Sequence, residues 1–292
     1  MYFPRYWHLS SSEATNPESG AQLPLNVWGW DDNSEEAAKQ LSEKRLARVV
    51  ERFKKGIQPQ WNSWYEYEDR PLREERIEEI SGESGLSAVV TRAKSGPLIL
   101  NTAGIMFVDI DLPEFYLQPS ARGCLGLLFP GKKTENPGQK STHYTVTLAK
   151  IEKAASLHPD FAARCYETPN GFRLLVTDKV YDPKRGVSKN ILQSFGADPL
   201  FTRLCEKQSC YRARLTAKPW RIGMKAAPAN WPVPDKLIAK HTRWLQSYAK
   251  ACVGTGACRF LKTIGTSNQV CDEAQVIIKI HDGLACTGDK LA

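Results

Sequence analysis

The run from Ile105 to Leu112, IMFVDIDL, constrains the fold of this chain more than any other stretch. Its apolar residues mostly follow one another without alternating with polar ones, which is typical of a β-strand buried on both faces. A strand of this kind needs further layers packed against its sheet. The run nevertheless contains Asp109 and Asp111, whose side chains share one face of a strand because side chains alternate with a period of two.

Two neighbouring carboxylates repel each other, and removing them from water is costly unless cations balance their charge. A divalent metal provides that balance, and Mg²⁺ in particular prefers oxygen ligands from carboxylates and phosphates. The alternative is that the strand ends at Asp109, so that both acids lie in solvent or pair with an arginine. Leu112-Pro113 is consistent with a strand that ends there.

The rest of the chain alternates strand and helix signals. Apolar runs bounded by small residues, and one pair of runs joined by the turn Pro169-Asn170-Gly171, predict strands. These runs span 86–92, 97–102, 104–111, 161–178 and 210–216. Helical periodicity with capping residues predicts helices over 31–56, 71–81, 187–196, 198–209 and 234–252. Residues 10–24, rich in Ser, Glu, Asn, Gly and Pro, predict an exposed loop.

This order predicts an α+β fold in which helices flank a mixed sheet. The signals divide the chain into three consecutive regions. We expect an N-terminal strand and helix region over 1–84, a catalytic-like α+β core over 85–225, and a mostly helical C-terminal region over 226–292.

Composition points to a cytoplasmic protein without a membrane partner. No stretch reaches the roughly 18 apolar residues that span a bilayer, and the N-terminus lacks the pattern of a secretion signal. Eight cysteines in a chain of 292 residues without such a signal indicate a reducing compartment. The net charge of +8 indicates an anionic partner.

The positive charge is concentrated between Thr202 and Lys225, where seven residues are basic and one, Glu206, is acidic. Aromatic rings stack on bases while Arg and Lys contact phosphates, so this segment predicts a nucleic-acid interface. We expect Tyr211, Trp220 and Lys225 to contact the nucleic acid. The alternative is an ordinary solvated strand face with aromatic residues in the core.

The acid pair and three later features occur in an order that resembles the archaeo-eukaryotic primase (primase-polymerase) superfamily. That family has a D-x-D on one strand, a small-x-His that opens a later strand, a third Asp, and an Arg-rich strand that runs into a turn with Pro and Lys. The corresponding features here are Asp109 and Asp111, Gly171-Phe172-Arg173, Asp198, and YRARLTAKPWR, within roughly residues 100–225. The resemblance implies a primase/RRM-like fold.

The resemblance also implies roles for these residues. Asp109, Asp111 and Asp198 would be catalytic carboxylates that bind Mg²⁺ or Mn²⁺, as two ions about 3.5–4 Å apart. Arg173 stands where the family has a nucleotide-contacting His. It can pair with a phosphate but cannot copy the proton chemistry of imidazole. The predicted substrate-binding residues are Arg173, Arg212, Arg214, Lys218 and Arg221.

Asp198 has a second interpretation, because Gly-Ala-Asp-Pro is also typical of a plain helix N-cap. Zinc is not expected, since the cysteine spacings lack the C-x₂-C hook of structural zinc sites, and buried reduced thiols are the default. The alternative is a four-thiolate zinc site made by Cys252, Cys258, Cys271 and Cys286.

These features predict a metal-dependent nucleotidyltransferase of primase-polymerase type, with a role in DNA replication or repair. Its partners would be a nucleoside triphosphate and a polynucleotide, either single-stranded or a primer–template. Two alternatives stay open. One is a nucleic-acid-binding protein of the same fold without turnover. The other is a metal-dependent nuclease or phosphohydrolase, because paired acids with basic residues also suit phosphodiester cleavage.

Overall fold

The computed structural model describes residues 1–18, 20, 22–57, 70–82, 85–112 and 137–292. The chain forms two compact units, each built from two separate stretches. Unit 1 comprises Met1–Ala103 and Leu204–Val253, and unit 2 comprises Gly104–Arg203 and Gly254–Ala292. The sequence suggested three consecutive regions instead, because strand pairing between distant stretches leaves no local signal.

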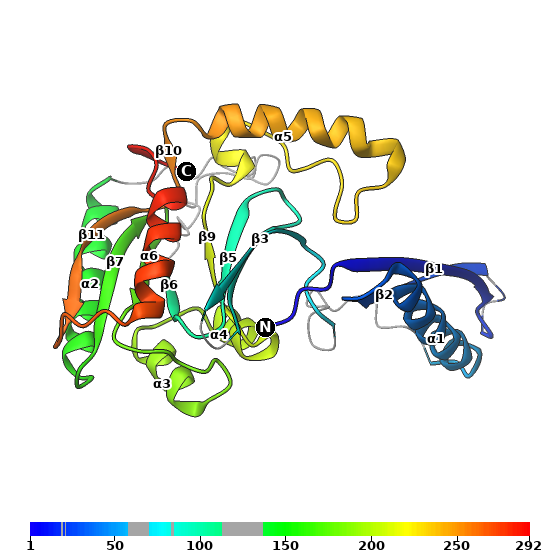
Figure 1. Cartoon of the computed structure of the whole chain (residues 1–292), viewed down its shortest axis with the longest axis horizontal. Helices are drawn as coiled ribbons and strands as arrows, with labels where there is room; N and C mark the ends of the chain where they lie inside the picture. The colour runs from blue at the N-terminus through cyan, green and yellow to red at the C-terminus, as the bar shows by residue number, and fades with distance from the viewer. Residues whose placement is uncertain (19, 21, 58–69, 83–84, 113–136) are drawn as a thin grey trace, which may run out of the picture. The chain divides into compact units, whose positions relative to one another are not determined.

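A long hairpin covered by a helix begins unit 1. Its elements are β1 (Tyr6–Thr15), β2 (Gln22–Asp31) and α1 (Glu35–Lys54). Ala14, Leu25 and Phe53, one from each element, form a small core, and Figure 1 shows α1 lying along the hairpin. The loop predicted over 10–24 was therefore wrong, because a two-stranded ribbon with one solvated face accepts Ser and Glu on that face.

The helix after this hairpin agrees with its capping signals. Ser34 is its N-cap, and the Ser34 hydroxyl accepts a hydrogen bond of 3.1 Å from the backbone N–H of Ala37. Gly56, just beyond its end, has φ +78°, a conformation that favours glycine.

A four-stranded antiparallel sheet makes the rest of unit 1, in the order β3-β4-β5-β9. Its strands are β3 (Glu75–Gly82), β4 (Gly85–Arg92), β5 (Leu98–Thr102) and β9 (Tyr211–Arg214). The short helices η1 (Pro219–Ile222) and η2 (Asp235–Leu237) and the helix α5 (Ile238–Cys252) follow β9. Helix α4 (Pro199–Gln208) spans the sequence boundary between the units.

The helix predicted over 71–81 is wrong, because β3 occupies most of this range. Glu and Arg favour helix as isolated residues, but here the segment pairs with β4, whose Val89 and Val90 are fully buried. As an edge strand, β3 keeps Glu78 and Glu79 in solvent and carries two register shifts. Tertiary pairing overrides local propensity at this edge.

Unit 2 is a second four-stranded antiparallel sheet with helices on both faces. The strand order is β11-β7-β8-β6. The strands are β6 (Phe107–Asp111), β7 (Ala162–Thr168), β8 (Gly171–Val176) and β11 (Arg259–Gly265). The helices are α2 (Pro137–Ser156), α3 (Gly186–Ser194) and α6 (Asp272–Ala285). Two short strands, β10 (Thr255–Gly256) and β12 (Lys290–Leu291), form a parallel pair.

Helices α2 and α6 cover opposite faces of this sheet. On one face, Tyr144 of α2 packs on Phe172 of β8, with ring centroids 4.7 Å apart. On the other, His281 of α6 packs between Phe107 of β6 and Tyr166 of β7, at 5.4 and 4.7 Å. Figure 1 shows α6 crossing in front of the strands. The apolar residues Ile105–Val108 and Ile110 are buried between these layers, as predicted, whereas Asp109 is half-buried and Asp111 is exposed.

The α+β class is confirmed, and the hairpin predicted at Pro169-Asn170-Gly171 is present as β7 and β8. No helix in the described part of the chain has an apolar stretch long enough to cross a bilayer.

Gly171 provides a test of the β6–β8 pairing. It lies opposite Asp111, and a Cβ at Gly171 would come within 2.0 Å of the carbonyl oxygen of Ile110. We expect Gly171→Ala to lower the free energy of unfolding by about 1–3 kcal/mol through overpacking, measured by urea denaturation. The control Gly186→Ala, where a Cβ meets nothing within 4 Å, should be neutral or slightly stabilising. Equal midpoints for the two variants would contradict the close approach.

Candidate functional site

A buried ion pair lies at the centre of the acidic site on β6. Asp109 pairs with Arg173 of β8 in the strand register. The Arg173 guanidinium donates from Nε to Asp109 Oδ1 at 2.8 Å and from a terminal nitrogen to Oδ2 at 3.3 Å. The Arg173 side chain is 4% exposed, whereas that of Asp109 is 36% exposed. This two-point contact is the strong form of an arginine–carboxylate pair.

Burial is the largest influence on the pKa of Arg173 and works to lower it, but the charge and hydrogen bond of Asp109, together with the nearby Cys258 and Cys286, leave that pKa raised. The guanidinium is therefore charged near pH 7. At Asp109, the structure therefore agrees with the alternative interpretation of the acid pair, in which a carboxylate pairs with an arginine. The same pair reduces the repulsion between Asp109 and Asp111, which lie on one face of β6.

Asp111 occupies the last position of β6 and is exposed. It lies opposite Gly171, the small residue of the Gly-Phe-Arg motif, whose lack of a side chain permits close approach of the two strands. The two acids therefore differ: the Asp109 carboxylate is half-buried and bound to Arg173, whereas Asp111 is exposed to solvent.

Asp198 acts as the N-cap residue of α4. Its Oδ1 accepts a hydrogen bond of 2.9 Å from the N–H of Leu200, and its carbonyl accepts one of 3.0 Å from the N–H of Thr202. Among the described residues, Asp109, Asp111 and Asp198 do not form a cluster with ligand atoms within 4.8 Å of one another. Metal binding by these three acids stays a prediction.

Apart from Arg173, the predicted cationic residues belong to unit 1, and two of them make contacts within that unit. Arg212 of β9 donates to both carboxylate oxygens of Glu74, at 2.7 and 2.9 Å, and both side chains are largely buried. Arg214 donates to the carbonyl of Thr216 at 2.8 Å. Arg212 in particular is held as a structural ion pair.

The predicted nucleic-acid contacts differ in exposure. Tyr211 is fully buried, so its ring is a core position of unit 1 and offers no face to a base. Trp220 in η1, by contrast, is 61% exposed. The Lys218 ammonium lies 5.2 Å from the centre of that indole, within cation–π range, and Lys225 is exposed. Arg221, between them, is half-buried.

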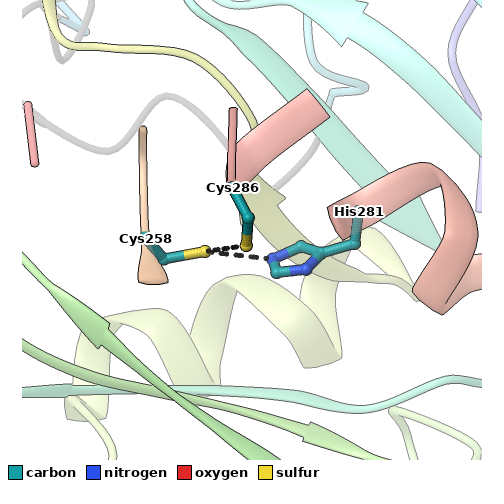
Figure 2. Close-up of side chains that lie close together, drawn as sticks. All are labelled: Cys258, His281 and Cys286. Carbon is teal, nitrogen blue, oxygen red and sulfur yellow. Dashed lines mark hydrogen bonds between the residues drawn. The ribbon is translucent and has the colours of Figure 1, made fainter. Parts of the chain in front are cut away.

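A second cluster in unit 2 brings together two thiols and an imidazole (Figure 2). Cys258 lies between β10 and β11, His281 lies in the last two turns of α6, and Cys286 is the residue after that helix. Cys258 Sγ is 3.7 Å from His281 Nε2 and 3.7 Å from Cys286 Sγ. All three ligand atoms lie within 4.8 Å of one another.

A carboxylate network orients the imidazole of this cluster. His281 Nδ1 is 2.9 Å from Asp282 Oδ1, which also accepts a 2.7 Å hydrogen bond from the Tyr166 hydroxyl. Arg164 binds the other carboxylate oxygen of Asp282 at 2.8 Å. Burial lowers the pKa of His281, so the ring is neutral near pH 7. The contact with Asp282 favours the proton on Nδ1 and leaves the Nε2 lone pair directed at the thiols.

The two thiols differ in acidity. The hydrogen bond from Cys258 lowers the pKa of Cys286, while that bond and burial together raise the pKa of Cys258. Cys286 therefore loses its proton first, and the nearby positive charge of Arg173 favours that thiolate.

Sequence reasoning had paired Cys258 and Cys286 with Cys252 and Cys271. Cys252 and Cys271 are not members of the cluster in the described residues. The dipeptide His281-Asp282 stands out near the C-terminus, but no C-x₂-C or H-x₃-H spacing includes His281, so its part in the cluster was not predicted. The available signal was the spacing H-x₄-C at 281–286, on a helix whose end approaches Cys258 only in the folded protein.

Comparison of the chain with protein-family models, with curated proteins and with solved structures gave no match. The functional argument therefore rests on these residues and their geometry.

The Arg173–Asp109 pair yields a stability prediction. Asp109→Asn leaves a buried arginine without its counter-charge. We expect a loss of about 2–3 kcal/mol, below the roughly 3–5 kcal/mol of fully buried pairs because Asp109 is partly solvated. In the double variant Asp109→Asn with Arg173→Met, most of this loss should be recovered. Urea denaturation of all four proteins gives the coupling free energy, and strictly additive effects would show that the two side chains do not interact.

Proposed function

We propose that the chain is a metal-dependent nucleotidyltransferase of primase-polymerase type, with a primase/RRM-like arrangement in unit 2. The observation that carries the proposal is the β6–β8 pairing. It brings the D-x-D acids Asp109 and Asp111 beside Arg173, the residue at the position of the family's nucleotide-contacting His, although 62 to 64 positions separate them in sequence. The D-x-D acids and the Gly-Phe-Arg motif lie next to each other at one end of the sheet. This proximity supports the resemblance in addition to the order of the motifs along the chain.

Asp109 can bind a metal ion while it is paired with Arg173. A carboxylate has about four lone-pair sites, and the guanidinium occupies two of them. Asp109 can therefore accept Arg173 and a cation together, while Asp111 offers solvent-facing oxygens to the same cation. Hard oxygen ligands of this kind suit Mg²⁺ or Mn²⁺, which keep waters and substrate phosphates in the remaining positions. The Asp198 carboxylate has one oxygen beyond its N-cap bond for a metal.

Each of these residues would have a separate role in the reaction. Asp109 and Asp111 would hold the ion that binds the triphosphate, and Arg173 would set the position of Asp109 and add positive charge beside the phosphates. When bound, this ion would supply positive charge to balance the negative charge that develops as a 3′-hydroxyl displaces pyrophosphate. Arg173 does not take up or release a proton in this scheme, because its pKa is raised.

Asp111→Asn is the most informative variant for this activity. It removes a predicted metal ligand and keeps both members of the Arg173–Asp109 pair in place. We expect incorporation of labelled nucleotide, on a primer–template with Mg²⁺ or Mn²⁺, to fall about 100-fold or more. The matched control Glu273→Gln removes an exposed carboxylate of the same unit and should keep full activity.

Three other results would contradict the proposal. Absence of incorporation by the wild type with either metal would exclude turnover of this kind. Metal-dependent loss of intact polynucleotide, abolished in Asp111→Asn, would identify a nuclease instead. Full activity in Asp111→Asn would remove the acid pair from the mechanism.

A non-catalytic role in nucleic-acid binding is the second candidate, favoured by the arginine in place of histidine. Its surface would be the exposed segment around Trp220, with Lys218, Arg221 and Lys225. Base–indole stacking contributes about 1–3 kcal/mol per base. This candidate predicts binding of single-stranded polynucleotide without any nucleotide incorporation.

For either candidate, we expect Trp220→Ala to weaken binding of single-stranded polynucleotide by about 5- to 100-fold, as measured by fluorescence anisotropy. The affinity should fall as salt rises, because Lys and Arg displace counterions. Tyr6→Ala, which removes another exposed ring of unit 1, is the control and should bind normally. Equal affinities for the two variants would place the interface elsewhere.

A further inference from the structure

We propose that Cys258, His281 and Cys286 bind one zinc ion that holds the end of α6 to the segment before β11. The cluster is separate from the acid pair in ligand chemistry. Two sulfurs and an imidazole nitrogen suit Zn²⁺, whereas carboxylate oxygens suit Mg²⁺ or Mn²⁺. The proposal therefore does not depend on the nucleotidyltransferase activity.

The spacing of the ligand atoms matches tetrahedral zinc. With Zn–S bonds of about 2.3 Å and a Zn–N bond of about 2.0–2.1 Å, a tetrahedral ion holds two sulfurs about 3.8 Å apart and a sulfur and a nitrogen about 3.6 Å apart. The distances from Cys258 Sγ to Cys286 Sγ and to His281 Nε2 are both 3.7 Å. In Figure 2, both thiols and the imidazole point toward one another from separate segments.

The surroundings of the cluster are those of a built metal site. Asp282 contacts Nδ1 of His281, and Tyr166 and Arg164 hold that carboxylate in turn. Carboxylate–histidine pairs of this type fix the tautomer and orientation of zinc-bound imidazoles. The backbone N–H of Cys258 donates to the carbonyl of Ala285 at 3.1 Å, which ties the two ligand-bearing segments together beside the sulfurs.

Charge balance also favours a dication. Two thiolates and one Zn²⁺ sum to zero, so a metal-bound cluster adds no net charge to a site where Cys258 and His281 are completely buried. Cys286 is only partly buried. The fourth coordination position would thus face the Cys286 side, where water can fill it.

The test uses the full chain, purified under reducing conditions without chelator. Mass-spectrometric metal analysis should find one zinc per chain. Replacement by Co²⁺ should give the visible d–d bands of a tetrahedral site and the near-ultraviolet thiolate-to-cobalt band. Cys286→Ser, at the most exposed ligand, should lower zinc affinity at least about 10-fold, and so should Asp282→Asn, which removes the carboxylate partner of His281.

Cys271→Ser is the matched control, since Cys271 is a half-buried thiol at the other end of the same helix. It should retain zinc and the cobalt spectrum. Chelation should lower the Tm of the wild type and of Cys271→Ser but not that of Cys286→Ser. None of these readouts uses nucleotide, so their outcome is independent of enzymatic activity.

The proposal is overturned if the reduced wild type contains no zinc and gives no tetrahedral Co²⁺ spectrum. It is also overturned if Cys286→Ser retains one tightly bound zinc, which would place the ion elsewhere. A Cys258–Cys286 disulfide in the protein as isolated, with no metal uptake after reduction, would identify the pair as a redox couple and overturn it equally.

Discussion

The buried, charged side chain of Arg173 constrains the structure of unit 2. Arg173 lies in a fully buried strand and remains charged, so the fold must provide a counter-charge inside the sheet. Asp109, in register on the neighbouring strand, provides it. The pairing needs antiparallel β6 and β8 in one register, because a shift by one residue would turn one of the two side chains to the opposite face. The same register places Gly171 against Asp111 and brings β6 close to β8.

The two candidate metal positions in unit 2 differ in the hardness of their ligands. The acid pair offers oxygens at the solvent end of a strand, while the cluster of Cys258, His281 and Cys286 offers sulfur and nitrogen under a helix. Ligand type and coordination geometry decide which metal ion each kind of site binds.

In unit 1, most of the predicted cationic and aromatic residues have structural partners. Arg212 is bound by Glu74, and Tyr211 is core. The exposed aromatic residue of this segment is Trp220 in η1, and the ammonium of the half-buried Lys218 lies over its indole ring. A basic, aromatic sequence segment thus contains both fold-determining and surface residues, and alternation along β9 separates them.

The sequence by itself determined the α+β class, the hairpin at Pro169-Asn170-Gly171, a cap of α1 at Asn33 or Ser34, and the burial of the apolar residues from Ile105 to Ile110. These follow from local chemistry: turn residues, capping side chains and apolar periodicity act within a few positions. The sequence also suggested that an arginine pairs with the acids, but only the strand register identifies this arginine as Arg173. The strand at 75–82 and the hairpin at 6–31 were missed because pairing overrode weak local preferences. Only the tertiary structure decided which stretches return to share a sheet, and it alone brought Cys258 to His281 and Cys286. Those contacts join positions 23 and 28 residues apart, and their energy depends on packing that no local pattern encodes.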